Sequence, residues 1–190
     1  MKKIYFVTTN SYKFRKFSEA INATEIQLEQ LNEETPEIQA TNNQEIASFS
    51  AQWAANKFNL PVVKEDVGLY FNVLKGFPGP YLNQIENWIE ADGFIALMNG
   101  KDDRSAYWEY AISYCEPGGE PVTFYTHQKG SIATEARGKS GWYADKVFMP
   151  ERQNKTTAEL LDNNTYVRND SHYAQLKKFF IDAFTNDSNS

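Results

Sequence analysis

Two adjacent carboxylates, Glu65 and Asp66, follow the apolar run Pro-Val-Val at the end of a predicted strand. Further carboxylates lie upstream in a polar loop around Thr-Pro-Glu-Ile-Gln, which contains Glu33, Glu34 and Glu37. Mg²⁺ binds one or two protein carboxylates together with water and substrate phosphate oxygens, so a strand-end Asp and a loop Glu would suffice. An Asp in that place could also orient or deprotonate an attacking water. The alternative is that these acids only solvate the ends of loops.

The segment Thr-Thr-Asn-Ser-Tyr-Lys, residues 8–13, offers hydroxyls, an amide and an ammonium at the start of a predicted helix. A helix N-terminus presents backbone N–H groups to an anion, and Lys13 would add a positive charge. The pattern therefore favours a phosphate site, although the glycines of a Walker loop are missing. An ordinary capped helix with a solvated lysine remains the alternative.

The chain contains two histidines, His127 and His172, which are too few for a typical His-rich zinc site. We expect His127 to be structural or exposed. His172 follows Ser171 at the start of the last predicted helix, where an N-cap role explains Ser171 and ligand contact by His172 is the less favoured interpretation. The single cysteine, Cys115, lies in an aromatic strand-like run and is expected to be a buried apolar group.

Hydrophobic periodicity predicts the elements that carry these residues. Strands are expected at 3–7 and 61–66, with a further short strand after Asp66, and a hairpin at 105–115 and 121–127 with a third strand at 130–136. Helices are expected after an N-cap at Ser11, from Ile46 to about Asn59, from Ile85 to Met98 with an interruption at Gly93, and from Ser171 onward. Residues 137–170 are polar, and 185–190 are expected to be a disordered tail. This order predicts an α/β protein with a mixed sheet, a single domain of two lobes around a central cleft.

The composition of the 190 residues is that of a globular protein, with a net charge of −6 and a pI near 5.0. Disorder along the whole chain and duplex nucleic acid as the main partner are therefore not expected. The N-terminal apolar run is too short for a signal or membrane segment, so we expect no membrane association and a cytoplasmic location.

Taken in order, these motifs resemble one family. T-T-N-x-x-K, P-E-x-Q, E-D-V-G, G-F-P-G-P-Y, a late G-x-I with R-G, and S-H before the last helix are similar to those of the Ham1-like inosine/xanthosine triphosphate pyrophosphatases. The resemblance runs from Lys3 to about Phe180, and Glu65–Tyr81 is its most specific part. It implies an elongated, two-lobed α/β fold with flanking helices, usually a homodimer, that uses Mg²⁺ to hydrolyse non-standard purine nucleoside triphosphates to the monophosphate and pyrophosphate.

The resemblance also implies roles for individual residues. Thr8, Thr9, Asn10 and Lys13 would hold the triphosphate. Glu37 and Asp66 would bind Mg²⁺, Asp66 would be the general base, and Glu65 would support them or act as an auxiliary ligand. Val67, Trp142, Tyr143 and Asp145 would lie at the substrate, with an aromatic ring on the base. Ser171 and His172 would reach the base or the phosphates from the last helix.

The chain departs from the family pattern at several of these places. Val67 stands where the family has Ser or Thr, Ala144 where it has an aromatic residue, and Ser50, Asn83, Val167 and Tyr173 where it has basic residues. Charge-assisted phosphate contacts contribute about 1.5–3 kcal/mol each, so substitutes are required for tight binding. Lys139, Lys146, Lys155 and Arg168 are the candidates.

The departures leave other functions open. The same fold could hydrolyse a different range of nucleotides, or it could bind nucleotides or act as a scaffold with weak or lost turnover. An α/β domain with no nucleotide role is the remaining alternative.

Overall fold

The computed structural model describes residues 2–22 and 25–185. Its helices are α1 (Ser11–Ile21), α2 (Asn43–Phe58), α3 (Leu82–Leu97), α4 (Thr157–Asp162) and α5 (Ser171–Thr185), with short 3₁₀ turns η1 (Asn72–Leu74) and η2 (Ala144–Lys146). The strands are β1 (Lys2–Val7), β2 (Ile26–Leu31), β3 (Val62–Phe71), β4 (Pro78–Gly79), β5 (Ser105–Cys115), β6 (Val122–Ile132) and β7 (Phe148–Pro150). Apart from Thr185, the predicted tail lies outside the described residues.

The strands form a seven-stranded mixed sheet in the order β2-β1-β3-β5-β6-β7, with β4 paired to β3. β1 is parallel to both β2 and β3, whereas β4 runs antiparallel to β3 and β7 antiparallel to β6. β5 and β6 are neighbours joined by a short loop, a connection that only antiparallel strands allow. The predicted mixed α/β sheet is thereby confirmed.

The chain divides into two compact units, each assembled from separate segments. The first unit comprises the chain up to Asp66, Tyr110–Thr126 and the chain from Asp170 onward; the second comprises Val67–Glu109 and His127–Asn169. Strands β3, β5 and β6 each contribute residues to both units.

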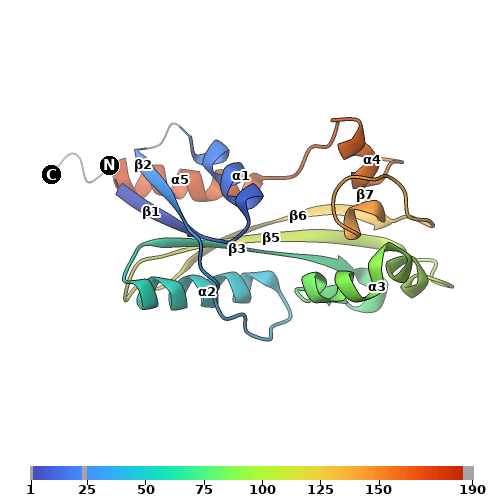
Figure 1. Ribbon diagram of the computed structural model, residues 1–190, viewed down its shortest axis with the longest axis horizontal. Coiled ribbons are helices and arrows are strands. Elements are labelled where there is room, and N and C mark those ends of the chain that lie inside the picture. Colours follow the sequence, from blue (N-terminus) through green and yellow to red (C-terminus); the bar gives the residue numbers. More distant parts are fainter. Residues whose placement is uncertain (1, 23–24, 186–190) are drawn as a thin grey trace. The chain divides into compact units, whose positions relative to one another are not determined.

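The first unit covers both faces of its strands with helices (Figure 1). Ile4 and Phe6 of β1 pack with residues of α1 and α5 in one core cluster, whereas Val7 packs with small residues of α2 in another. The alternation of β1 side chains explains the two destinations. Ala51, Ala54 and Ala55 let α2 approach the sheet closely.

Aromatic side chains dominate the core of the second unit. Phe71 at the end of β3 lies 5.9 Å from Phe94 of α3, and Trp108 of β5 lies 6.0 Å from Phe148 of β7, both measured between ring centroids. A capping box fixes the start of α4, because the Thr156 hydroxyl accepts from the Glu159 N–H while the Glu159 carboxylate accepts from the Thr156 N–H.

Among the described residues, no helix is long and apolar enough to cross a membrane.

Several predicted boundaries were wrong. Asn10, rather than Ser11, is the N-cap of α1. The strand expected to stop at Asp66 continues without a break to Phe71. No separate third strand occurs at 130–136, because residues 130–132 are the end of β6 and residues 133–136 are not in a strand. The predicted interruption of α3 at Gly93 lies instead at Glu90, whose φ of 54° and ψ of −165° are not helical. Strands β2 and β7 and helix α4 were not predicted.

Candidate active site

The turn between β1 and α1 is held by its own side chains. The Asn10 side-chain oxygen accepts hydrogen bonds from the backbone N–H of Tyr12 at 2.9 Å and of Lys13 at 3.2 Å. The Thr8 hydroxyl accepts from the Asn10 N–H at 3.1 Å. The N-terminal end of α1 is thus capped, with Lys13 in its first turn and Thr9 exposed.

Glu65 and Asp66 point to opposite faces of β3, as adjacent strand residues must. Val63, two residues before Glu65, belongs to the core cluster shared with α1 and α5, and Val62, four residues before Asp66, belongs to the cluster shared with α2. Glu65 therefore faces α1 and α5, while Asp66 faces α2. The two carboxylates can have different functions although they are neighbours in sequence.

Glu65 is buried within a network of donors. Its Oε1 accepts a hydrogen bond from the Tyr173 hydroxyl at 2.7 Å and lies 3.1 Å from His172 Nε2. Its Oε2 forms an ion pair with Lys13 Nζ at 3.6 Å. The network brings the predicted phosphate-binding lysine together with the last helix through Glu65.

Asp66 accepts a hydrogen bond from Asn43 Nδ2 of α2 at 2.6 Å. The pKa of Asp66 is raised to about 6, chiefly by burial and also by the charge of Glu37, although Lys13, Asn43 and Lys64 act in the opposite direction. Asp66 is therefore a carboxylate whose pKa suits proton transfer near neutral pH.

Lys64, two residues before Asp66, shares its face of β3. Burial and the nearby charge of Lys13 lower the pKa of Lys64, while Glu37, Asp66 and Glu34 raise it. Two lysines and several carboxylates thus interact electrostatically around Lys64 and Asp66 of β3. Sequence reasoning missed Lys64 and Asn43, although the period-two alternation of β3 could have indicated Lys64.

Asp66 and Glu37 are the carboxylates that could hold a divalent cation here. No group of three or more His, Cys, Asp or Glu side chains with metal-binding geometry occurs in the described parts of the chain. Asp66 and Glu37 nevertheless interact as like charges, and a hard cation between two carboxylates would relieve that repulsion. Mg²⁺ needs no more than one or two protein carboxylates, so these two residues fit it.

Ser171 and His172 are the first two residues of α5. Ser171 is the first helical residue and its hydroxyl donates to the Thr126 hydroxyl at 2.7 Å, so the predicted N-cap function was wrong. His172 is fully buried, its ring stacks on Tyr110, and its Nδ1 has no hydrogen-bond partner within the described chain. Contact of His172 with a ligand stays a prediction.

The residues predicted to meet the base lie in the second unit. Trp142 is half-exposed, and its backbone N–H donates to Asp145 Oδ2 at 2.9 Å. Burial raises the pKa of Asp145 to about 6. A Cβ at Gly141, whose φ is +80°, would lie 2.4 Å from Asp145 Oδ2, so glycine is required there. Tyr143 precedes η2, and Val67 is partly buried in β3.

The positions that depart from the family pattern have different environments. Ser50 is fully buried and its hydroxyl donates to the Pro36 carbonyl at 3.1 Å, whereas the Val167 side chain is 81% exposed. Asn83 is exposed in the first turn of α3. Tyr173 is fully buried and bonded to Glu65.

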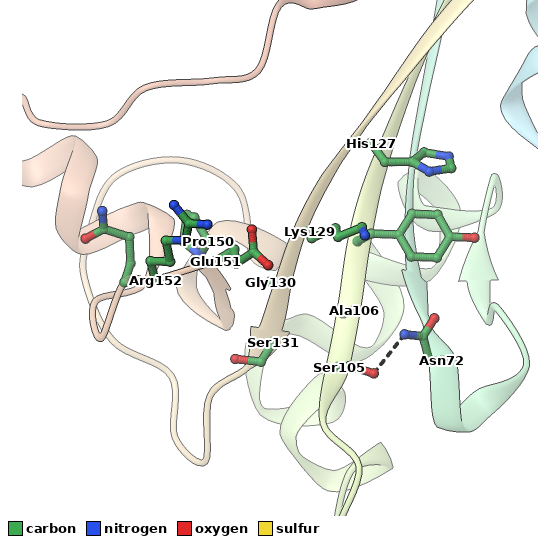
Figure 2. A pocket seen from close by; sticks show the side chains of 12 residues that line it. Asn72, Ser105, Ala106, His127, Lys129, Gly130, Ser131, Pro150, Glu151 and Arg152 are labelled. Carbon is green, nitrogen blue, oxygen red and sulfur yellow. Dashed lines mark hydrogen bonds between the residues drawn. The ribbon is translucent and has the colours of Figure 1, made fainter.

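A cavity of about 660 Å³ lies elsewhere in the second unit, beside β5, β6 and the loop after β7 (Figure 2). Its lining includes Tyr107, His127, Lys129 and Arg152. His127 Nε2 lies 2.8 Å from Oε2 of the buried Glu109, within hydrogen-bond distance, which agrees with the structural role expected for it. None of the predicted site residues lines this cavity, so we do not place the chemistry there.

Sequence comparisons agree with the motif pattern. A sequence model of the Ham1 family matches residues 4–172. The dITP/XTP pyrophosphatase of Methanosarcina acetivorans is 38% identical over 185 residues, covering 97% of this chain and 98% of that protein. The dITP/XTP pyrophosphatase of Methanosarcina mazei is 41% identical over 162 residues, covering 85% of this chain and 87% of that protein.

Solved structures give the same result for the fold. A HAM1 protein from Coxiella burnetii superposes with a TM-score of 0.82 at 24% identity, covering 96% of this chain and 100% of that chain. A nucleoside-triphosphatase, or dITP/XTP pyrophosphatase, from Mycobacterium abscessus gives a TM-score of 0.72 at 25% identity, covering 85% of this chain and 90% of that chain. The family match spans most of the chain, and the chain belongs to the Ham1 family.

Proposed function

We propose that this protein hydrolyses non-standard purine nucleoside triphosphates, such as dITP and XTP, to the nucleoside monophosphate and pyrophosphate. The observation that carries the proposal is the placement of Lys13 and Lys64 within charge interaction of Asp66, whose pKa is raised to about 6. That combination supplies positive charge for a polyphosphate beside a carboxylate able to accept a proton. Family membership and the names of the relatives support the substrate class.

In the proposed reaction, a water attacks the α-phosphorus in line with the bond to the bridging oxygen. A new phosphorus–oxygen bond forms, the bond to the bridging oxygen breaks, and the β and γ phosphates leave together as pyrophosphate. Asp66 accepts the proton of the attacking water, and Asn43 fixes its carboxylate at 2.6 Å. Its pKa, raised to about 6, leaves it mostly ionised at pH 7 and more basic than an ordinary aspartate.

Positive charge and backbone dipoles hold the polyphosphate in place. The first turn of α1 offers N–H groups and Lys13, and the preceding Thr8, Thr9 and Asn10 offer hydroxyls and an amide. Lys64 adds the second cation from β3. Phosphoryl transfer depends chiefly on such positioning and charge neutralisation, so these residues contribute to both binding and rate.

We propose Mg²⁺ as the cofactor, held by Asp66 and Glu37. When bound, it would neutralise phosphate charge and polarise the reacting phosphoryl group. Glu65 is unsuited to the same ion because it faces the other side of β3 and is engaged with Tyr173, His172 and Lys13. We therefore assign to Glu65 and His172 a supporting role, in which they act through Lys13.

For the base, we propose contacts from the second unit. Trp142 and Tyr143 offer aromatic faces, and Asp145 offers a partly buried carboxyl that could bond to an N–H of a purine. Hydrogen bonds of this kind discriminate strongly between bases. Ala144 stands where the family pattern has an aromatic residue. The preference of this protein among the non-standard purine bases therefore has to be measured.

A nucleotide-binding protein without turnover is the second candidate. The buried, uncharged Ser50 and the exposed Val167 favour it, since both stand where the family pattern has a basic residue. Lys64 argues against this candidate because it restores positive charge beside Asp66.

We further propose that the protein is a homodimer, which light scattering would test, and that it is located in the cytoplasm, which cell fractionation would test.

The bond that is broken can be identified by hydrolysis in water enriched in oxygen-18, followed by mass spectrometry of the products. The proposal expects the label in the nucleoside monophosphate and none in the pyrophosphate. Label in pyrophosphate, or release of orthophosphate as the first product, would contradict it. Nucleotide binding measured by calorimetry without any hydrolysis would favour the second candidate.

A further inference from the structure

Glu65 is fixed from three sides by residues of the first unit, and the three contacts divide between its two oxygens. The Tyr173 hydroxyl, at 2.7 Å, and His172 Nε2, at 3.1 Å, both contact Oε1. Lys13 Nζ lies 3.6 Å from Oε2. The Glu65 side chain is fully buried, so its orientation depends on these contacts rather than on water.

Tyr173 is itself held rigidly. It is fully buried in the core between α1 and α5, and its ring centroid lies 5.3 Å from that of Phe17. Phe17 follows Lys13 by one helical turn on the same face of α1. The hydroxyl of Tyr173 is therefore placed by the same helix whose lysine Glu65 contacts.

We propose that Tyr173 is a positioning residue for triphosphate binding, and that it acts through Glu65 on the Lys13 ammonium. The hydrogen bond at Oε1 orients the carboxylate so that Oε2 faces Lys13. Because 3.6 Å is longer than a hydrogen bond, the ion pair attracts the ammonium without using its N–H donors, which remain available for phosphate. This inference rests on the proposed function, because it assumes that Lys13 contacts the polyphosphate.

Tyr173→Phe tests the inference, because it removes the hydroxyl and keeps the ring that packs on Phe17. Lys13 binds the phosphates in both the ground state and the transition state, so its misplacement raises KM more than it lowers kcat. We expect KM for dITP to rise about fivefold, with kcat changed less than about twofold. Calorimetry with a non-hydrolysable triphosphate should show the same loss of affinity.

Tyr114→Phe is the matched control. Tyr114 lies in the same core cluster, and its hydroxyl donates to Glu116 at 2.7 Å, outside the Glu65 network. It should leave KM unchanged. A double-mutant cycle then isolates the pathway: in a Lys13→Ala background, Tyr173→Phe should alter KM less than about twofold. Glu65→Gln, which keeps an acceptor for Tyr173 and loses the charge facing Lys13, should raise KM as Tyr173→Phe does.

Three outcomes would overturn the inference. One is an unchanged KM in Tyr173→Phe while Lys13→Ala raises KM, and another is an equal effect of Tyr173→Phe with and without Lys13. The third is a lower Tm with normal nucleotide affinity, which would make Tyr173 a packing residue only.

Should Tyr173→Phe not fold, an unchanged KM in Glu65→Gln would be decisive against the inference. Absence of pyrophosphate release from the unaltered protein would instead refute the proposed function, and calorimetry would still test Tyr173.

Discussion

The two carboxylates of Glu-Asp are separated by the geometry of a strand. Alternation sends Glu65 toward α1 and α5, where it contacts Lys13, and Asp66 toward α2, where it is bonded to Asn43. Adjacent acids in a sequence are easily taken as joint ligands. Because the two side chains lie on opposite faces of β3, we propose a role at the water and the metal for Asp66 alone.

Asp145 gives a prediction for stability. Its pKa is about 6 in the folded protein and 3.8 in the reference state, because burial disfavours the ionised form. Below pH 3.8 both states are protonated and there is no penalty; as the pH rises to 6, ionisation increasingly favours the unfolded chain. Asp145→Asn should therefore raise the free energy of unfolding by about 1–3 kcal/mol at pH 7 and by little at acidic pH.

Denaturant titrations of the nucleotide-free protein across this pH range would measure the difference. Asp92→Asn, at an exposed position of α3, is the control. A gain from Asp145→Asn that does not vary with pH would contradict the assignment of the penalty to ionisation.

Lys64 gives a prediction for binding. Burial and Lys13 disfavour its charge in the free protein, so Lys64→Met should keep or increase Tm. The same change should raise KM for dITP by about tenfold or more, because a charge-assisted phosphate contact is lost. Opposite effects on stability and affinity would separate this result from simple unfolding. The control is Lys101→Met, at an exposed loop position, which should change neither Tm nor KM. An unchanged KM in Lys64→Met would show that Lys64 does not contact the phosphates.

Candidate site residues could be proposed from the sequence where the pattern of their immediate neighbours indicates their position in the fold. Lys13 and Asp66 were proposed because each follows a strand-like run in the sequence, and their roles stay predictions. Asn43 and Tyr173 were missed as partners because their contacts, Asn43 with Asp66 and Tyr173 with Glu65, join elements far apart in the chain. No local pattern signals such a pairing.

At the scale of elements, the turn between β1 and α1 depends on Asn10. Its side chain accepts from two backbone N–H groups that otherwise lack helical partners. Asn10→Ala should destabilise the protein by about 1 kcal/mol, equivalent to a fall in Tm of roughly 2–4 °C for a chain of this size. Asn10→Ser should restore most of the loss because serine is also a good cap. Calorimetric scans of both variants would decide, and an unaltered Tm in Asn10→Ala would contradict the capping role.

The missed elements share a physical reason. β2 does not alternate strictly, because Glu29 and Gln30 are both polar, and Ile26 is its one β-branched residue. It is a strand because it pairs in register along β1 from Lys2 to Val7. β7 has three residues, too few for any periodicity, and is defined by its pairing with the end of β6. The break of α3 at Glu90 carries no glycine or proline signal. Strong periodic segments such as α2 and β5 were predicted closely.

At the scale of the whole molecule, each unit is assembled from separated segments of the chain. The residues proposed for the phosphates and for the water belong to the first unit, and those proposed for the base belong to the second. The fold class followed from the alternation of helix and strand patterns. The interleaving of segments did not, because it depends on long strands that pass from one unit into the other.

Pyrophosphate release from dITP in the presence of Mg²⁺, measured side by side for the unaltered protein and Asp66→Asn, tests the central claim most directly. The account predicts steady release of pyrophosphate with deoxyinosine monophosphate in equal amounts, and a loss of kcat of about 10²–10⁴ in Asp66→Asn, since the general base is removed without a large change in shape. No release by the unaltered protein, or equal rates for the two proteins, would contradict it.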